Sequence, residues 1–433
     1  MAFCLQCAEA TTLLYLIPTN LIALAATIEA STEKIFLPNR PVAFMSAIAL
    51  PHFYANRPFA AKRFTAIVSW ARQYHPFYLQ RLKHADQQVP LLSRAEILAD
   101  NELLLNGQPE TGRTSGSTGI PVRFAWSAQR QKISQLESQH YVRDWLGGAL
   151  PRSRIIRVKG KQAEDTLDIS AALPEQADFL RQRFDHAGAV SVITYPTNAY
   201  QLAQYFLEQG IDGSFVQRFS CFAEAFEPHQ EQAVAQAFPN AKVFTTYSAT
   251  ELGMIAARCP HQSDYHHLFA AKLGVEILDD DGQLCPPGQL GRVVITDYFN
   301  RITPFIRYDI GDMAAYGDCP CGKISFPALT HIAGKVRGLL RKKDGQKVMF
   351  SHLDAALRDV PGMGQFQVVQ HAIQQFELRF VAAVQFDRAL FERSAQALFG
   401  EQFGDDVQLR FSQTDRLPRG ANGKFYASIC HID

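Results

Sequence analysis

The stretch Thr114–Pro121 reads TSGSTGIP, and it decides how the rest of the chain is interpreted. It combines small hydroxyl residues with two glycines and contains no large side chain before Ile120. Such a run contributes little to a core, but its backbone N–H groups and hydroxyls can surround an anion. The stretch is therefore a candidate phosphate-binding loop. Taken alone, it is equally consistent with a flexible linker.

Length and composition limit the class of protein. The chain has 433 residues, of which 47% are hydrophobic, and this favours a soluble globular protein of two or three domains. The 43 basic and 42 acidic residues give a formal net charge of +1. Because this balance creates no strong field, we expect neither nucleic acid nor an anionic membrane as a partner. Small-molecule chemistry fits better.

The apolar segment Thr11–Ala30 is interrupted by polar residues and Pro18, and no basic residue precedes it. It matches neither a membrane span nor a secretory signal, so we expect a helix that packs on the protein, with an interfacial anchor as the alternative. The eight cysteines are scattered along the chain. This spacing favours reduced cysteines and a cytoplasmic location, with metal binding as the use of any close pair.

After the candidate loop, apolar strands alternate with helices, and this alternation predicts a parallel sheet. The expected strands are Arg154–Lys159, Val190–Tyr195, Phe219–Phe222 and Lys242–Thr246. The expected helices include Ala128–Leu146 and Ala199–Gln209, the second preceded by an exit turn at Tyr195–Asn198 and closed by Gly210. Before the loop, Ser93 and Glu96 have the spacing of a capping box.

From Lys272 onward the pattern changes to short strands with turns, which predicts a β-rich subdomain. Gly, Lys and Arg crowd together at Gly334–Lys343, where we expect a domain boundary. The predicted fold is α/β. It has a large N-terminal domain, residues 1–336, with parallel sheets, flanking helices and the β-rich subdomain. A small mobile α+β domain, residues 337–433, follows.

Three further segments follow the loop in a fixed order. They are YSATELG at Tyr247–Gly253, RYDIGD at Arg307–Asp312 and LPRGANGK at Leu417–Lys424. In the order and spacing of these motifs the chain resembles the adenylate-forming superfamily of acyl-CoA synthetases, and within it the phenylacetate-CoA ligase-like branch. The resemblance extends from about His75 to Lys424 and is far more specific than any single loop.

The resemblance implies an ATP site. The outer phosphates are held by the loop residues Thr114, Ser115, Gly116, Ser117, Thr118 and Gly119. Tyr247 stacks on adenine, Thr250 meets the phosphate, and Glu251 holds Mg²⁺, a hard cation that prefers carboxylate oxygen. Glu227 lies beside adenine, although Phe226 stands where the family has a glycine.

The resemblance also assigns roles later in the chain. Asp312 accepts both ribose hydroxyls, and Lys424 is the mobile catalytic lysine that stabilises the charge developing during adenylation. The family's hinge reads Gly-Arg-x-Asp-Asp, whereas this chain reads GKVRG at Gly334–Gly338. Lys335 keeps a positive charge near the ribose but lacks the planar guanidinium of arginine.

The cysteines near these motifs suggest a metal. Cys319 and Cys321 follow the Asp312 segment, and Cys259 follows the Glu251 segment with histidines nearby. Three thiolates and one imidazole form a closed tetrahedral zinc set. The resemblance implies such a site, because some members of the branch carry one. The spacing favours His266 as the fourth ligand, with His261 as the alternative. The competing interpretation is free buried cysteines.

The acid-binding pocket is the least defined part of the sequence. The resemblance implies that the acid lies between the helix after the loop, the strand-turn near Tyr195–Pro196 and the segment Phe222–Ser248. The candidate wall residues are Tyr141, Phe222, Ala223, Phe244 and Thr245. Arg157, Lys159 and Lys161 replace an expected aromatic and glycine-rich stretch, so a hydroxylated or amino-substituted aryl acid is as plausible as phenylacetate.

The implied activity is a two-step reaction in which a carboxylic acid, aryl or arylalkyl, reacts with ATP and the acyl group then passes to coenzyme A. The implied cofactors are ATP, Mg²⁺, coenzyme A and a structural Zn²⁺. The alternatives left open are a phosphopantetheinyl carrier protein or an amine as acceptor, and a non-catalytic nucleotide-binding homologue. A homodimer is left open as the assembly.

Overall fold

The computed structural model places most of the chain from residue 57 onward. The residues it describes are 57–83, 89–114, 120–158, 162–335, 340–348, 350, 353, 357, 360–382, 385–415, 417–418 and 425–432. The predicted helix at Thr11–Ala30 lies outside them. Among the described residues, no helix is both long enough and apolar enough to cross a membrane.

The described chain begins with helices that precede the candidate loop. They are α3 (Arg57–Tyr74), α4 (Pro76–Arg81), α5 (Arg94–Ala99) and α6 (Asn101–Leu105). The capping box at the start of α5 is confirmed, because Ser93 Oγ accepts the backbone N–H of Glu96 at 3.2 Å and the Glu96 carboxylate accepts that of Ser93 at 2.8 Å. The short strands β1 (Gly112–Arg113) and β2 (Arg123–Phe124) then pair in antiparallel fashion on either side of the loop.

The predicted helix at Ala128–Leu146 is present as α7 (Ala128–His140), followed directly by a π-helical turn at Tyr141–Trp145. Ser127 caps α7 by accepting the backbone N–H of Arg130 at 3.2 Å. A π turn widens the helix by one residue and often occurs at functional sites. Here it carries Tyr141, one of the candidate pocket residues.

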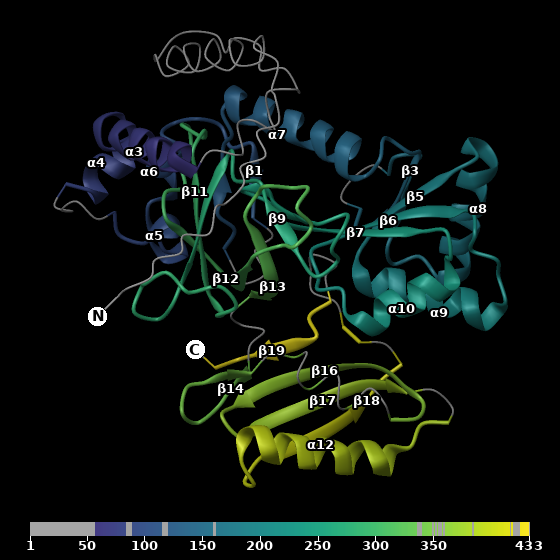
Figure 1. The fold of residues 1–433 in the computed structure, drawn as a ribbon. Helices are drawn as coiled ribbons and strands as arrows, with labels where there is room; N and C mark the ends of the chain where they lie inside the picture. Colours follow the sequence, from purple (N-terminus) through teal and green to yellow (C-terminus); the bar gives the residue numbers. More distant parts are fainter. Residues whose placement is uncertain are drawn as a thin grey trace, which may run out of the picture. The chain divides into compact units, whose positions relative to one another are not determined.

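The alternation of strands and helices is confirmed in the next part of the chain. The elements are β3 (Arg152–Ile156), β4 (Thr166–Asp168), α8 (Leu173–Ala187), β5 (Val190–Thr194), α9 (Pro196–Gln209), β6 (Val216–Phe222), α10 (Pro228–Ala237) and β7 (Lys242–Ala249). The strands are parallel to one another. Helices α9 and α10 lie side by side along them (Figure 1) and share an apolar core with β5 and β6.

One boundary in this region was predicted wrongly. The expected exit turn at Tyr195–Asn198 is the first turn of α9, because Pro196 occupies the first helical position, where its missing N–H and fixed φ cost nothing. At the other end, Gly210 closes the helix as predicted, with a left-handed φ of 62°.

The β-rich region is confirmed, and it continues the same sheet. Its strands are β8 (Gly253–Arg258), β9 (His266–Leu268), β10 (Leu273–Leu278), β11 (Gly291–Asp297), β12 (Tyr308–Gly317) and β13 (Ala328–Lys335). The sheet has 11 strands in the order β10-β11-β12-β13-β9-β8-β7-β6-β5-β3-β4. The pairing is parallel from β4 to β7 and antiparallel from β7 onward. The change of direction therefore falls between β7 and β8.

The last part of the chain is a small α+β unit. It contains the hairpin β14 (Leu340–Arg341) and β15 (Lys347–Val348), strands β16 (Met363–Ala372), β17 (Gln375–Ala382), β18 (Gln408–Gln413) and β19 (Ser428–Cys430), and helix α12 (Arg388–Phe403). The strand order is β18-β17-β16-β19. Helix α12 covers one face of this sheet (Figure 1), and its phenylalanines complete a separate apolar core. The predicted α/β fold with a small α+β C-terminal part is confirmed.

Candidate functional site

Two of the sequence motifs meet where the large sheet changes from parallel to antiparallel. Tyr247 lies near the end of β7, and its hydroxyl donates to Asp312 Oδ2 on β12 at 2.7 Å. Burial, together with the adjacent Asp312 carboxylate, raises the pKa of Tyr247 well above its usual value. The phenol therefore stays protonated and keeps the Asp312 carboxylate in place.

Glu251 lies in the turn between β7 and β8, beside this pair. Its side chain is buried, and Tyr308 on β12 donates to Glu251 Oε1 at 3.5 Å. Asp312 is buried to the same degree, with 7% of each residue exposed. The structure thus brings Tyr247, Glu251 and Asp312 together, while Thr250 is exposed at the tip of the same turn. Carboxylate oxygens are the donors that Mg²⁺ prefers, so Glu251 fits its predicted role chemically.

The ends of the candidate phosphate loop are held together, while Ser115, Gly116, Ser117, Thr118 and Gly119 lie outside the described residues. The Thr114 backbone N–H donates to the Val122 carbonyl at 2.9 Å, and the Thr114 hydroxyl accepts the Val122 N–H at 3.0 Å. Arg94, which the sequence analysis missed, donates to the Thr114 hydroxyl at 3.4 Å and to the Ile120 carbonyl at 2.8 Å. The Arg94 guanidinium therefore places a positive charge where the two ends of this loop come together.

The structure shows less about the surroundings of three other predicted site residues. Glu227 is the N-cap residue of α10, at the carboxyl end of β6, where its N–H donates to Gln230 Oε1 at 3.1 Å. Lys335 lies directly opposite Asp312 in the β12–β13 ladder. Lys424 lies outside the described residues. Its role remains a prediction, as do the nucleotide-binding roles of Glu227 and Lys335.

The candidate pocket residues lie around β6 and β7. Phe244 and Thr245 are buried on β7, next to Ser220 and Cys221 of β6 in the ladder. Burial raises the pKa of Tyr141, and its phenol interacts electrostatically with Cys221 on β6. The structure therefore brings Tyr141 to the same strands as Phe244 and Thr245.

The end of β6 carries the other two candidates. The Phe222 ring lies 5.1 Å from that of Tyr195, centroid to centroid. Ala223, directly after β6, has a φ of 72°, a left-handed conformation that non-glycine residues rarely adopt. Such strain often occurs at functional sites.

Cysteines from two distant parts of the chain meet beside β9. Within the described residues, the candidate metal ligands Cys259, His267, Cys319 and Cys321 have donor atoms that all lie within 4.8 Å of one another. The sulfurs of Cys259 and Cys319 are 3.8 Å apart, and Cys321 Sγ lies 3.7 Å from His267 Nε2. A tetrahedral zinc site with Zn–S bonds of about 2.3 Å separates its sulfurs by about 3.8 Å. The donor set and its spacing therefore fit Zn²⁺.

The predicted fourth member of this group, His266, has to be corrected to His267. Both residues lie on β9, where successive side chains point to opposite faces of the sheet. His267 points toward the cysteines, whereas His266 Nε2 lies 2.7 Å from the Thr245 hydroxyl. His261, the alternative, is not a member of the group either.

The surroundings of His267 fit a metal ligand. Its Nδ1 lies 2.9 Å from the Phe326 carbonyl, to which it donates when Nε2 is left free as a ligand. Trp145, from the π turn, packs edge-on against the His267 ring at 6.0 Å. The same indole contacts Tyr141 at 5.7 Å between ring centroids. The cluster is therefore joined by one aromatic side chain to a candidate pocket residue.

The fold and the C-terminal part have known relatives. The large mixed sheet with its small C-terminal α+β unit has the same fold as solved CoA ligase structures. Residues 340–430 match in addition a family model described as the CapK C-terminal domain. A search by sequence among curated proteins gives no match.

Three solved structures illustrate the similarity. A 2-hydroxyisobutyryl-CoA ligase in complex with R3-HIB-AMP superposes with a TM-score of 0.69 at 18% identity, over 91% of this chain and 94% of that one. The anthranilate CoA ligase AuaEII in complex with anthranoyl-AMP gives 0.55 at 15% identity, over 73% and 64%. The amide bond synthetase McbA from Marinactinospora thermotolerans gives 0.52 at 17% identity, over 71% and 66%.

Proposed function

We propose that the protein is an ATP-dependent acid–thiol ligase. A carboxylic acid attacks the α-phosphate of ATP, giving an acyl-adenylate and pyrophosphate, and a thiol then displaces AMP. The observation that carries this proposal is the meeting of Tyr247, Glu251 and Asp312 at the β7–β8 junction. In open α/β sheets, ligands bind at the carboxyl ends of the parallel strands, which is where this group lies.

Each residue has a proposed task. The Asp312 carboxylate, oriented by Tyr247, accepts the ribose hydroxyls, and the loop from Thr114 to Gly119 surrounds the outer phosphates. Glu251 and Thr250 hold Mg²⁺ and phosphate beside them. When bound, Mg²⁺ neutralises charge on the phosphates. Lys424 supplies a further positive charge as pyrophosphate leaves.

Coenzyme A is the proposed acceptor, because two of the similar structures are CoA ligases holding an acyl-AMP or related adenylate. CapK is a phenylacetate-CoA ligase-like protein, so the match to its C-terminal domain supports membership in that branch. An amine acceptor is the second candidate, since an amide bond synthetase shares the fold. A carrier protein as acceptor and a non-catalytic nucleotide-binding homologue remain as alternatives.

An aryl or arylalkyl acid is the proposed substrate. The candidate pocket residues Tyr141, Phe222 and Phe244 are aromatic and lie around β6 and β7. Zn²⁺ is the proposed occupant of the cluster of Cys259, His267, Cys319 and Cys321, with a structural role because its four protein donors leave no open position. A boundary between residues 336 and 337 is supported by the family match, which begins at residue 340.

The proposed function is tested by acid-dependent exchange of pyrophosphate into ATP across a panel of aryl, arylalkyl and short aliphatic acids. We expect exchange with at least one acid. Mass spectrometry after adding coenzyme A, a phosphopantetheinyl carrier protein or an amine then identifies the acceptor. ATP binding without exchange for any acid would favour the non-catalytic homologue and refute the proposal.

Replacing Asp312 with alanine is expected to raise the KM for ATP about 10- to 100-fold. A hydrogen bond to a charged group contributes about 1.5–3 kcal/mol, and Asp312 offers two acceptors to the ribose. The measurement is pyrophosphate exchange at varied ATP and saturating acid. Tyr247→Phe is the matched variant, because it retains the ring and the carboxylate and removes only the 2.7 Å contact. A KM for ATP that Asp312→Ala leaves unchanged would contradict the ribose assignment.

A further inference from the structure

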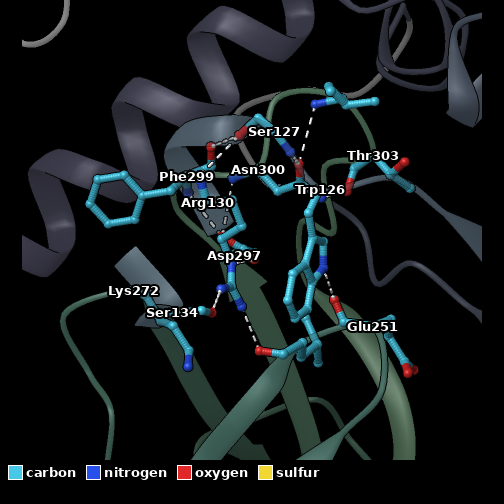
Figure 2. Close-up of polar contacts among 12 residues, drawn as sticks. Trp126, Ser127, Arg130, Ser134, Glu251, Lys272, Asp297, Phe299, Asn300 and Thr303 are labelled. Atoms are coloured by element: carbon cyan, nitrogen blue, oxygen red, sulfur yellow. Dashed lines mark hydrogen bonds and ion pairs between the residues drawn. The ribbon is translucent and has the colours of Figure 1, made fainter. Parts of the chain in front are cut away.

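The turn that carries Glu251 is held by two side chains from a distant part of the sequence. The Trp126 indole N–H donates to the Glu251 carbonyl at 2.8 Å, and Arg130 Nη2 donates to the Leu252 carbonyl at 2.5 Å. Figure 2 shows the indole and the guanidinium lying against this turn. Gly253 follows with a φ of 67°, and a Cβ there would lie 3.5 Å from the Trp126 ring. Both carbonyls and the end of the turn are therefore fixed by one short stretch of chain.

Arg130 is itself fully engaged. Among the residues whose burial the structure describes, it is the largest side chain with no exposed surface, and its Nε donates to Asp297 Oδ2 at 2.5 Å. Its Nη1 donates to Ser134, one turn further along α7. The guanidinium carbon also lies 4.7 Å from the centre of the Trp126 ring. A guanidinium held in this way has one orientation, so its contact with Leu252 is rigid.

The base of this arrangement is equally buried. Asn300 donates to the Ala125 carbonyl at 2.9 Å and accepts the Ser127 N–H at 3.2 Å. The Thr303 hydroxyl accepts the Ala125 N–H at 2.9 Å. Asp297 Oδ1 in turn accepts the Asn300 N–H at 3.1 Å. The segment on either side of Trp126 is thus tied to the end of β11 and the loop that follows it.

This segment also continues from the candidate phosphate loop. Beyond the loop the chain passes through β2 and reaches Trp126 two residues after Phe124. The Trp126 backbone N–H donates to the Thr111 hydroxyl at 3.0 Å, just before β1. Both ends of the phosphate loop are therefore linked to the turn that carries Glu251.

We propose that Trp126 and Arg130 are positioning residues that fix the Glu251 turn relative to β1 and β2, the strands on either side of the candidate phosphate loop, so that magnesium and the ATP phosphates bind together. The inference rests on the proposed function, because it takes Glu251 as the magnesium-holding group. Groups that hydrogen-bond behind a metal-holding residue commonly change metal affinity 10- to 100-fold when they are removed.

Trp126→Phe is the variant that tests the proposal. Removing Arg130 would leave the buried Asp297 carboxylate unpaired and endanger folding. Phenylalanine keeps an aromatic ring at position 126 and removes the N–H that reaches Glu251. Trp70→Phe is the matched control, because Trp70 lies on α3 and its ring packs against Arg301 and His75.

The readout is calorimetric ATP binding with and without Mg²⁺. We expect Trp126→Phe to reduce the Mg²⁺-dependent gain in ATP affinity about 10-fold, with little change in metal-free ATP binding or in Tm. In a Glu251→Gln background, the same substitution is expected to change this gain less than about twofold, because the group being positioned is absent. The Trp70→Phe control should behave as wild type.

The outcomes separate this inference from the proposed function. If the wild type binds ATP no more tightly with Mg²⁺ than without it, the magnesium site of the proposed function fails. If the wild type shows the gain and Trp126→Phe leaves it unchanged, the positioning role is overturned. An equal loss in the wild-type and Glu251→Gln backgrounds would show a general structural effect and would also overturn it.

Discussion

Replacing Lys424 with alanine is expected to lower acid-dependent pyrophosphate exchange by about 100-fold or more, while ATP binding stays close to that of the wild type. Negative charge grows on the phosphoryl oxygens only as the acid attacks and pyrophosphate leaves. A positioned donor that acts at this stage is worth about 100- to 1,000-fold in rate. Because the contact exists mainly in the transition state, the loss should appear in kcat rather than in the KM for ATP.

The control for this variant is Lys343→Ala. Lys343 belongs to the same C-terminal unit and forms an exposed ion pair with Asp406 at 2.6 Å. Exposed pairs of this kind contribute little, so we expect full activity and an unchanged Tm. Exchange by Lys424→Ala at the level of Lys343→Ala would show that the charge comes from elsewhere. Arg94, which contacts both ends of the phosphate loop, would then be the next residue to replace.

Local signals in the sequence predicted most of the fold. The capping box at Ser93 and Glu96 and the glycine that closes α9 act over a few residues, so they are readable without tertiary context. The error at Pro196 has the same local origin, because proline is common both in turns and at the first position of a helix. The parallel and antiparallel parts form one sheet because β8 pairs with both β7 and β9, and β9 in turn pairs with β13, which is distant in the sequence. No local pattern shows that last pairing.

Sequence motifs identified residues that meet at the candidate site, whereas buried polar residues outside the motifs were missed. Tyr247 and Asp312 belong to recognisable segments 65 residues apart, and the structure brings them into contact. Arg130, Ser134 and Glu137 occur at helical spacing on α7, and such a polar stripe normally indicates a solvent-exposed face. Here Arg130 and Glu137 are completely buried, because Asp297 at the end of β11 and Lys272 just before β10 neutralise them.

The choice between His266 and His267 shows a different limit. Sequence spacing locates β9, but a shift of one residue decides which side chain faces the cysteines. The two histidines are adjacent and of the same type, so neither composition nor periodicity separates them. Only the pairing of β9 with β8 and β13 fixes the face on which each lies.

The second large effect is expected at this cluster. Cys321→Ser should remove the bound metal and lower Tm by about 5–10 °C, since a metal that binds only the folded chain stabilises it by mass action. The measurements are metal content by mass spectrometry after purification without added zinc, and thermal unfolding with and without a strong chelator. Cys285→Ser is the matched control, because Cys285 is buried and free but lies outside the cluster.

The aromatic contacts of His267 extend this prediction from stability to binding of the acid. Trp145 stacks on Phe269 at 5.6 Å and contacts both His267 and Tyr141. Loss of the metal would free the His267 side chain, and the Trp145 indole would lose a fixed contact on that side. The KM for the acid should therefore rise more than the KM for ATP, whose proposed residues lie on the β7–β8 turn and on β12. Two results together would contradict the prediction: no zinc in the purified protein, and a Tm that neither a chelator nor Cys321→Ser changes. They would show that the three cysteines are reduced and pack beside His267 without a metal.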